Sequence, residues 1–132
     1  MLKWIIVLAL LMHGVGHITF FFAAFTPVAM DFEPNPWILP GAFTMDSPVG
    51  KAFAVLWLVA MIGFVAPALG LASNQPWWPT VAVAASVISL VVILPWWNTI
   101  NPSTRFWACA ADVVVIVAFA FPWRAQVVAA LA

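Results

Sequence analysis

The chain has very few charged side chains. Four Lys or Arg and four Asp or Glu residues make up 6% of its 132 residues, and the formal net charge is zero. A soluble domain carries about 25% charged residues, so this chain does not have enough polar surface to remain folded in water. The balanced charge also gives no basic surface of the kind that binds nucleic acid, and no nucleic-acid partner is expected.

Cysteine, tyrosine and catalytic motifs are equally scarce. Cys109 is the single cysteine, which excludes a disulfide within the chain, and tyrosine is absent. The sequence contains no Walker loop, no CxxC, no HExxH and no nucleophile elbow. A known catalytic motif therefore does not indicate the function.

Hydrophobic residues dominate instead, at 67% of the chain, with a mean hydropathy of +1.15. A span across the bilayer needs about 20 apolar residues, and it must be helical because lipid offers no partner for free backbone groups. The sequence predicts an all-α integral membrane four-helix bundle, formed by a single domain 1–132 in contact with the lipid bilayer. The predicted spans are about 4–25, 49–71, 77–97 and 103–122, with an extramembrane loop at 26–48.

Local signals support these limits. Ser47-Pro48 and Asn101-Pro102 each combine a helix-capping residue with a proline suited to the first helical position. Seven of the nine tryptophans fall near predicted span ends, where a belt of aromatic rings at the membrane surface is expected. They are Trp4, Trp77, Trp78, Trp96, Trp97, Trp107 and Trp123.

The orientation in the membrane is weakly specified. Four spans put both chain ends on one side, and each side carries two basic residues near its span ends, so the positive-inside rule gives a tie. The 26–48 loop contains Asp31, Glu33 and Asp46, which is more typical of an exterior segment. We therefore expect cytoplasmic termini.

One Asp and two His side chains lie away from the ends of the predicted spans. Asp112 is near the middle of the fourth span, where a carboxyl group usually faces the bundle interior. His13 and His17 are four residues apart, so both imidazoles lie on one face of the first helix. Gly14 and Gly16 allow a close neighbour there, either another helix backbone or a flat cofactor.

These side chains are predicted to share a depth in the membrane. At ~1.5 Å per residue, His13 and His17 lie roughly 14 and 20 Å from the side where the first helix enters, and Asp112 lies about 16–17 Å from that side. Ser86 and Ser89 of the third span come out at about 14 and 18 Å. All five side chains are thus candidates for one polar layer near the midplane.

Three interpretations of this layer stay open. In the first, histidine, serine and carboxyl groups only fix helix packing, with Ser86 and Ser89 as midplane packing residues. In the second, His13, His17 and Asp112 bind a metal such as zinc or non-haem iron. In the third, these residues bind a haem, a pigment or a quinone, or handle protons. Two axial haem ligands from one protomer are excluded, because both histidines belong to one helix.

The segment Leu10-Leu11-Met12-His13-Gly14-Val15-Gly16-His17 resembles the first span of small bacterial four-helix membrane proteins, including the DoxX-like group. Pro76-Trp77-Trp78-Pro79, Trp96-Trp97-Asn98 and Phe106-Trp107 are similar to segments of related uncharacterised families. The resemblance implies a four-helix bundle in the bacterial inner membrane. Because some DoxX-type proteins accompany quinone-dependent redox systems, it also implies an accessory or partner-binding subunit, with other membrane subunits or further copies of the chain as partners.

Overall fold

A computed structural model describes residues 1–28, 30 and 32–131, and within them the chain is all-helical. Four helical segments are long and apolar enough to cross a membrane: Leu2–Phe25, Pro48–Ala72, Trp78–Thr99 and Pro102–Ala120. Their limits lie within two residues of the predicted spans at each end. The chain is therefore a multi-pass integral membrane protein, and the predicted fold class is confirmed.

The first span is two helices rather than one. Helix α1 runs over Leu2–Gly16 and helix α2 over Ile18–Phe25, with His17 between them. Helix α3 is Pro48–Ala72, and Ser47 caps it by accepting a hydrogen bond from the backbone N–H of Gly50. The capping role predicted for Ser47 is confirmed.

The third and fourth spans come as α4, η1 and α5. Helix α4 covers Trp78–Ile93 and continues as the tighter 3₁₀ helix η1 over Leu94–Thr99. A proline at the second position of η1 cannot donate a backbone hydrogen bond, which favours this change of helix type. Helix α5 is Pro102–Ala120, capped by Asn101 as the sequence predicts.

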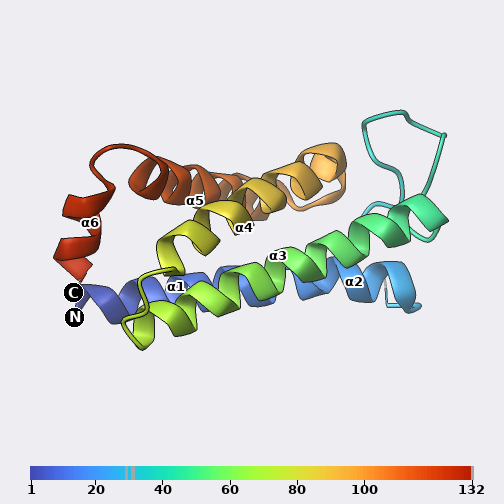
Figure 1. The fold of residues 1–132 in the computed structure, drawn as a ribbon. Coiled ribbons are helices and arrows are strands. Elements are labelled where there is room, and N and C mark those ends of the chain that lie inside the picture. The colour runs from blue at the N-terminus through green and yellow to red at the C-terminus, as the bar shows by residue number, and fades with distance from the viewer. Residues whose placement is uncertain (29, 31, 132) are drawn as a thin grey trace.

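A short helix that the sequence analysis did not predict follows the fourth span. Helix α6, Arg124–Leu131, folds back after a turn and places the buried Leu131 against Val7, Leu10 and Leu71. Figure 1 shows α6 beside both chain ends, while the connection between α2 and α3 lies at the opposite end of the bundle. Helix α6 thus covers the end of the bundle at which the chain begins and finishes.

Helix α3 is the centre of the packing. It contacts α1 and α2 on one side and α4 on the other, while α5 reaches the bundle mainly through α4 (Figure 1). One apolar cluster near the chain ends contains Phe64, Trp78 and Phe119, and a second near the 26–48 loop contains Phe20, Trp57 and Trp96. Trp78 and Trp96 are therefore core residues, and their assignment to the membrane-surface belt was wrong.

The 26–48 segment is tied to η1. Trp37 donates its indole N–H to the carbonyl of Leu94, and Asn98 donates its side-chain amide to the carbonyl of Asn35 at 2.9 Å. The backbone N–H of Glu33 reaches the carbonyl of Thr99. Of the three acids used for the orientation, Asp31 lies outside the described residues, and cytoplasmic termini stay a prediction.

Candidate functional site

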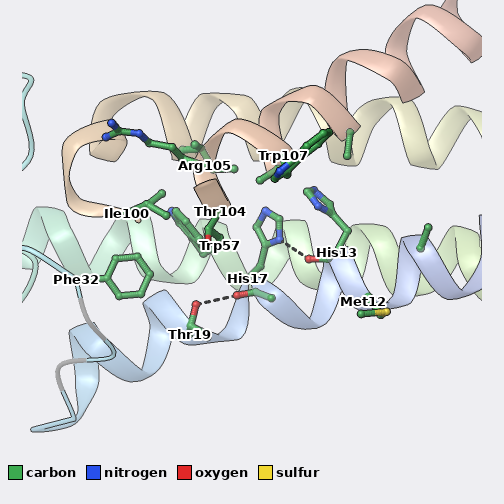
Figure 2. A pocket seen from close by; sticks show the side chains of 15 residues that line it. Met12, His13, His17, Thr19, Phe32, Trp57, Ile100, Thr104, Arg105 and Trp107 are labelled. Carbon is green, nitrogen blue, oxygen red and sulfur yellow. Dashed lines mark hydrogen bonds between the residues drawn. The ribbon is translucent and has the colours of Figure 1, made fainter. Parts of the chain in front are cut away.

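The site begins with the irregular turn at His17. In a regular helix the backbone N–H of His17 would donate to the carbonyl of His13, four residues earlier. Here it donates to the carbonyl of Gly14 at 3.0 Å instead. The freed carbonyl of His13 lies 3.0 Å from Nδ1 of the His17 ring (Figure 2). The break in the first span therefore supplies a backbone acceptor that orients one of the two histidines.

Gly14 explains how closely α1 approaches α3. A Cβ atom added to Gly14 would lie 2.9 Å from Cβ of Phe64 and 3.1 Å from the carbonyl oxygen of Met61, so a side chain does not fit. A Cβ atom added to Gly16 would meet nothing within 4 Å, and Gly16 lines an open space. The expected close neighbour of the two glycines is therefore the backbone of α3, and it meets Gly14 alone.

Four of the five predicted polar residues form one hydrogen-bonded network. Nε2 of His13 lies 3.0 Å from Oδ1 of Asp112. The hydroxyl oxygen of Ser89 lies 2.6 Å from Oδ2 of Asp112 and 2.9 Å from Nε2 of His17. The network joins α1, α4 and α5, and the depth of these residues in the membrane stays a prediction.

The network is almost entirely shielded. Ser89 and Asp112 are fully buried and His17 is 3% exposed, whereas 15% of the His13 side chain is exposed. Buried polar groups are stable in lipid only when they are hydrogen-bonded, which these contacts achieve. His13 is thus the most exposed member of the network.

Ser86 does not join the network. It is fully buried one turn before Ser89 on α4, and its hydroxyl has no hydrogen-bond partner within the described part of the chain. It lies in the small-residue surface of α4, which includes the buried Ala82 and Ala85. The sequence predicts the same packing role for both serines. Of the two, only Ser89 makes hydrogen bonds within the network.

A cleft of about 500 Å³ lies beside the network, between the first span and α5. Figure 2 shows the rings of His13 and His17 pointing from the first span towards α5, with Trp57 beside them. Met12 and Trp107 also line the cleft, and each is 68% exposed on the outer surface of the bundle. The cleft therefore reaches the lipid-facing surface.

The cleft walls are mainly apolar. Aromatic and aliphatic side chains of the spans and of the segments that connect them contribute to these walls, among them Phe32, Trp57, Ile93, Ile100 and Trp107. Arg105 also lines the cleft, but its guanidinium donates to the backbone carbonyl of Trp97. The same guanidinium lies 4.9 Å from the centre of the Trp97 indole ring. The polar side chains of the lining are those of His13, His17, Thr19, Thr104 and Arg105.

Aromatic side chains of α3 hold the two imidazoles. The ring of Phe64 is perpendicular to that of His13, with centroids 4.4 Å apart, and the ring of Trp57 lies 5.2 Å from that of His17. Trp57 donates its indole N–H to the carbonyl of Val92 on α4. Neither residue is predicted from the sequence to belong to the site, although the position of Trp57 in the middle of a span, rather than at its end, is a signal that could have identified it.

The arrangement of donors does not favour a metal. Among the described residues, no group of three or more His, Cys, Asp or Glu side chains is arranged to hold a metal ion. Both nitrogens of His17, one nitrogen of His13 and both oxygens of Asp112 lie within hydrogen-bond distance of protein atoms. The predicted metal, haem and pigment sites at these residues stay predictions.

The fold and the site define a class: a four-span integral membrane protein with a buried histidine–carboxyl network beside a lateral apolar cleft. Comparison with known proteins adds no particular family, since no family, no curated protein and no solved structure matches the chain. The function must therefore be argued from the site.

Proposed function

We propose that this membrane protein binds a lipid-soluble ligand with a proton-exchanging oxygen, of the quinone and quinol class, in the cleft between the first span and α5. The observation that supports this proposal is the position of His13. Its Nε2 atom contacts the fully buried carboxyl group of Asp112, while its ring lines a mainly apolar cleft. A ligand ring would occupy the apolar walls, and its oxygen would face the imidazole.

The size and position of the cleft suit such a ligand. Ligand pockets have volumes of about 300–1,000 Å³, and they combine apolar walls with a few polar groups. The cleft, at about 500 Å³, falls in this range. Its lateral opening beside Met12 and Trp107 lets an apolar ligand arrive from the bilayer without passing through water.

The chemistry of His13 suits both states of a quinone. A neutral imidazole donates with one nitrogen and accepts with the other. With Nε2 donating to Asp112, Nδ1 is the acceptor, and no described residue occupies it. Nδ1 therefore accepts from a quinol hydroxyl, and after protonation it donates to a quinone carbonyl.

The proposal includes the accessory role that the sequence predicts. Binding and proton exchange are carried out by His13 and Asp112, whereas the electrons of a quinone reaction are exchanged with a partner subunit in the same membrane. The resemblance of the 10–17 segment to DoxX-like proteins supports this division, since some of those proteins accompany quinone-dependent redox systems.

The test is equilibrium binding of a short-chain benzoquinone, and of its quinol, to the protein in lipid nanodiscs. We expect saturable binding above the partition into empty nanodiscs, and at least a tenfold loss of affinity in His13→Ala, or about 1.4 kcal/mol. Leu8→Ala is the control, because Leu8 is an exposed α1 residue outside the cleft lining, and it should bind normally.

Two results would overturn the proposal. One is uptake equal to that of empty nanodiscs. The other is unchanged affinity in a His13→Ala variant that is folded and monodisperse. Either result would favour the interpretation in which the network only fixes helix packing.

A further inference from the structure

The hydrogen-bond geometry determines which atoms of the network carry protons. The first of these atoms is Nδ1 of His17. Nδ1 of His17 lies 3.0 Å from the backbone carbonyl oxygen of His13. A carbonyl oxygen only accepts hydrogen bonds, so Nδ1 must carry a proton. If His17 is neutral, its other nitrogen, Nε2, therefore has no proton and is an acceptor.

The Ser89 hydroxyl then stands between two acceptors. It lies 2.9 Å from Nε2 of His17 and 2.6 Å from Oδ2 of Asp112. A hydroxyl has one proton, so it can donate to only one of them. With an ionised Asp112 and a neutral His17, the second contact would bring two lone pairs face to face in a buried site, which is unfavourable.

One additional proton removes this conflict, and two arrangements can hold it. In the first, Asp112 is a carboxylic acid: its Oδ2 donates to Ser89, and Ser89 donates to Nε2 of His17. In the second, His17 is an imidazolium: its Nε2 donates to Ser89, and Ser89 donates to the Asp112 carboxylate. In both arrangements, each donor in the series Asp112, Ser89 and His17 has an acceptor.

We propose that His17, Ser89 and Asp112 form a proton relay that holds one proton more than an ionised acid beside two neutral histidines. Conversion between the two arrangements moves two protons, one across each hydrogen bond of Ser89, and needs no movement of the heavier atoms. The summed charge of the three side chains is zero in both. Charge separation is unfavourable in an apolar interior, so the neutral acid is the resting arrangement.

The relay connects to the cleft through His13. Oδ1 of Asp112 accepts from Nε2 of His13, which leaves Nδ1 of His13 as an acceptor for a ligand. If a quinol hydroxyl gives its proton to Nδ1, an imidazolium forms and the ligand keeps the oxygen anion. The Asp112 proton then moves through Ser89 to His17, so that a carboxylate faces the new imidazolium. This last step, unlike the relay itself, rests on the proposed function.

Few other groups interfere with the relay. The titratable side chains near Asp112 within the described part of the chain are His13 and His17 on the first span and Cys109 on α5. Helix α3 presents the uncharged Trp57 and Phe64 to the histidines. The protonation of the network can therefore be assigned from two histidines, one acid and one thiol.

The test needs no ligand. In nanodiscs at neutral pH, ¹⁵N NMR of histidine-labelled protein reports the protons of both rings, and infrared spectroscopy reports the Asp112 carboxyl. We expect a protonated-carboxyl band that disappears in Asp112→Asn, together with a neutral His17 protonated on Nδ1. An ionised Asp112 beside two neutral histidines in the wild-type protein would overturn the relay.

Two serines provide matched variants. Ser89→Ala removes the hydroxyl that links the acid to His17, so we expect Asp112 and His17 to titrate independently instead of as one unit. Ser86→Ala removes a hydroxyl that lies near Asp112 but makes no hydrogen bond among the described residues, so Asp112 and His17 should still titrate as one unit. Identical titrations in Ser89→Ala and in the wild type would also overturn the relay.

Asp112→Asn provides a variant that preserves the hydrogen bonds. The amide of an asparagine donates to Ser89 as the neutral acid does, so His17 should keep a proton on Nδ1 alone. An imidazolium at His17 in this variant would contradict the proposed direction of the hydrogen bonds. Because these measurements use the protein without ligand, an intact relay combined with absent quinone binding would refute the proposed function alone.

Discussion

The two halves of the bundle on either side of Asp112 are built differently. Towards the chain ends, Phe119 of α5 packs against Trp78 at 4.8 Å between ring centroids, and Leu131 of α6 joins the same cluster. Towards the 26–48 loop, α5 lines the open cleft instead, with Thr104 and Ala108 among the lining residues. One helix thus borders a packed core with one half and a cavity with the other.

This difference shows what keeps a cleft open inside a membrane. Lipid is as apolar as a protein interior, so the hydrophobic effect does not draw helices together there, and close packing decides which gaps are filled. Large aromatic side chains fill the half near the chain ends. In the cleft half, the small residues Gly16, Ala108 and Ala111 face the gap, and the network at Asp112 connects α5 to α1.

Removing an aromatic ring from each half gives the largest expected contrast. Phe119→Ala leaves a cavity in the packed half and should destabilise the fold by roughly 2–3 kcal/mol, less than in water-soluble cores because lipid is also apolar. Trp107→Ala removes an exposed side chain and should leave stability nearly unchanged while weakening quinone binding. Steric-trap unfolding in bicelles measures the stability of both variants. Equal destabilisation would contradict the difference in packing between the two halves of the bundle.

The two glycines of the first span give a smaller contrast. Gly14→Ala forces a Cβ atom against Phe64 and Met61 and should destabilise the protein by roughly 1–2 kcal/mol. Gly16→Ala meets open space and should be neutral or slightly stabilising, because alanine favours helix. The same unfolding assay measures both variants. A destabilised Gly16→Ala would mean that the cleft is filled at this point.

The hydrogen-bond network at Asp112, which lies between the two halves, should contribute only modestly to the stability of the fold. Asp112→Ala removes the hydrogen-bond partner of both His13 and Ser89 and should destabilise the fold by about 1 kcal/mol, the scale of hydrogen bonds within membranes. Val113→Ala changes a half-exposed neighbour on α5 and is the control for the loss of side-chain volume. The free energies of unfolding of both variants are measured in the same lipid. Equal values would show that the network does not stabilise the packing of α5.

The smallest effect concerns Asp46, outside the spans on the cleft side. A hydrogen bond from the Thr44 hydroxyl lowers the pKa of this exposed carboxyl below its usual value of 3.8. A lowered pKa contributes stability above pH 4, and the contribution is lost as the pH falls through the lowered pKa. In Thr44→Val, a ¹³C titration should show the pKa of Asp46 rising towards its usual value. Thr26→Val, which alters a hydroxyl bonded to a backbone carbonyl, should leave it unchanged.

The sequence predicts the spans because length and hydropathy are local properties. Each run of apolar residues is read directly, and Ser47 and Asn101 mark helix starts through their capping side chains. The common depth of His13, Ser89 and Asp112 also follows from counting along four straight helices. Hydrogen-bonded contact among them required that the helices also face the right way, which depth alone does not give.

The remaining features depend on packing between distant residues. The break at His17 is produced when a ring nitrogen replaces the backbone N–H at the carbonyl of His13, and hydropathy contains no signal for it. Trp78 and Trp96 lie near span ends in sequence but turn inwards, since interface and core suit tryptophan equally. The cleft arises because α5 packs mainly on α4, which no single segment reveals.

Photoaffinity labelling with a short-chain azidoquinone in native-like lipid tests whether the cleft binds a quinone. We expect labels on cleft residues of the first span and of the 104–111 part of α5, removed by excess unlabelled quinone and lost in His13→Ala. Labels spread over the lipid-facing surface of all spans, and unaffected by competing quinone, would show that the cleft is not a quinone site.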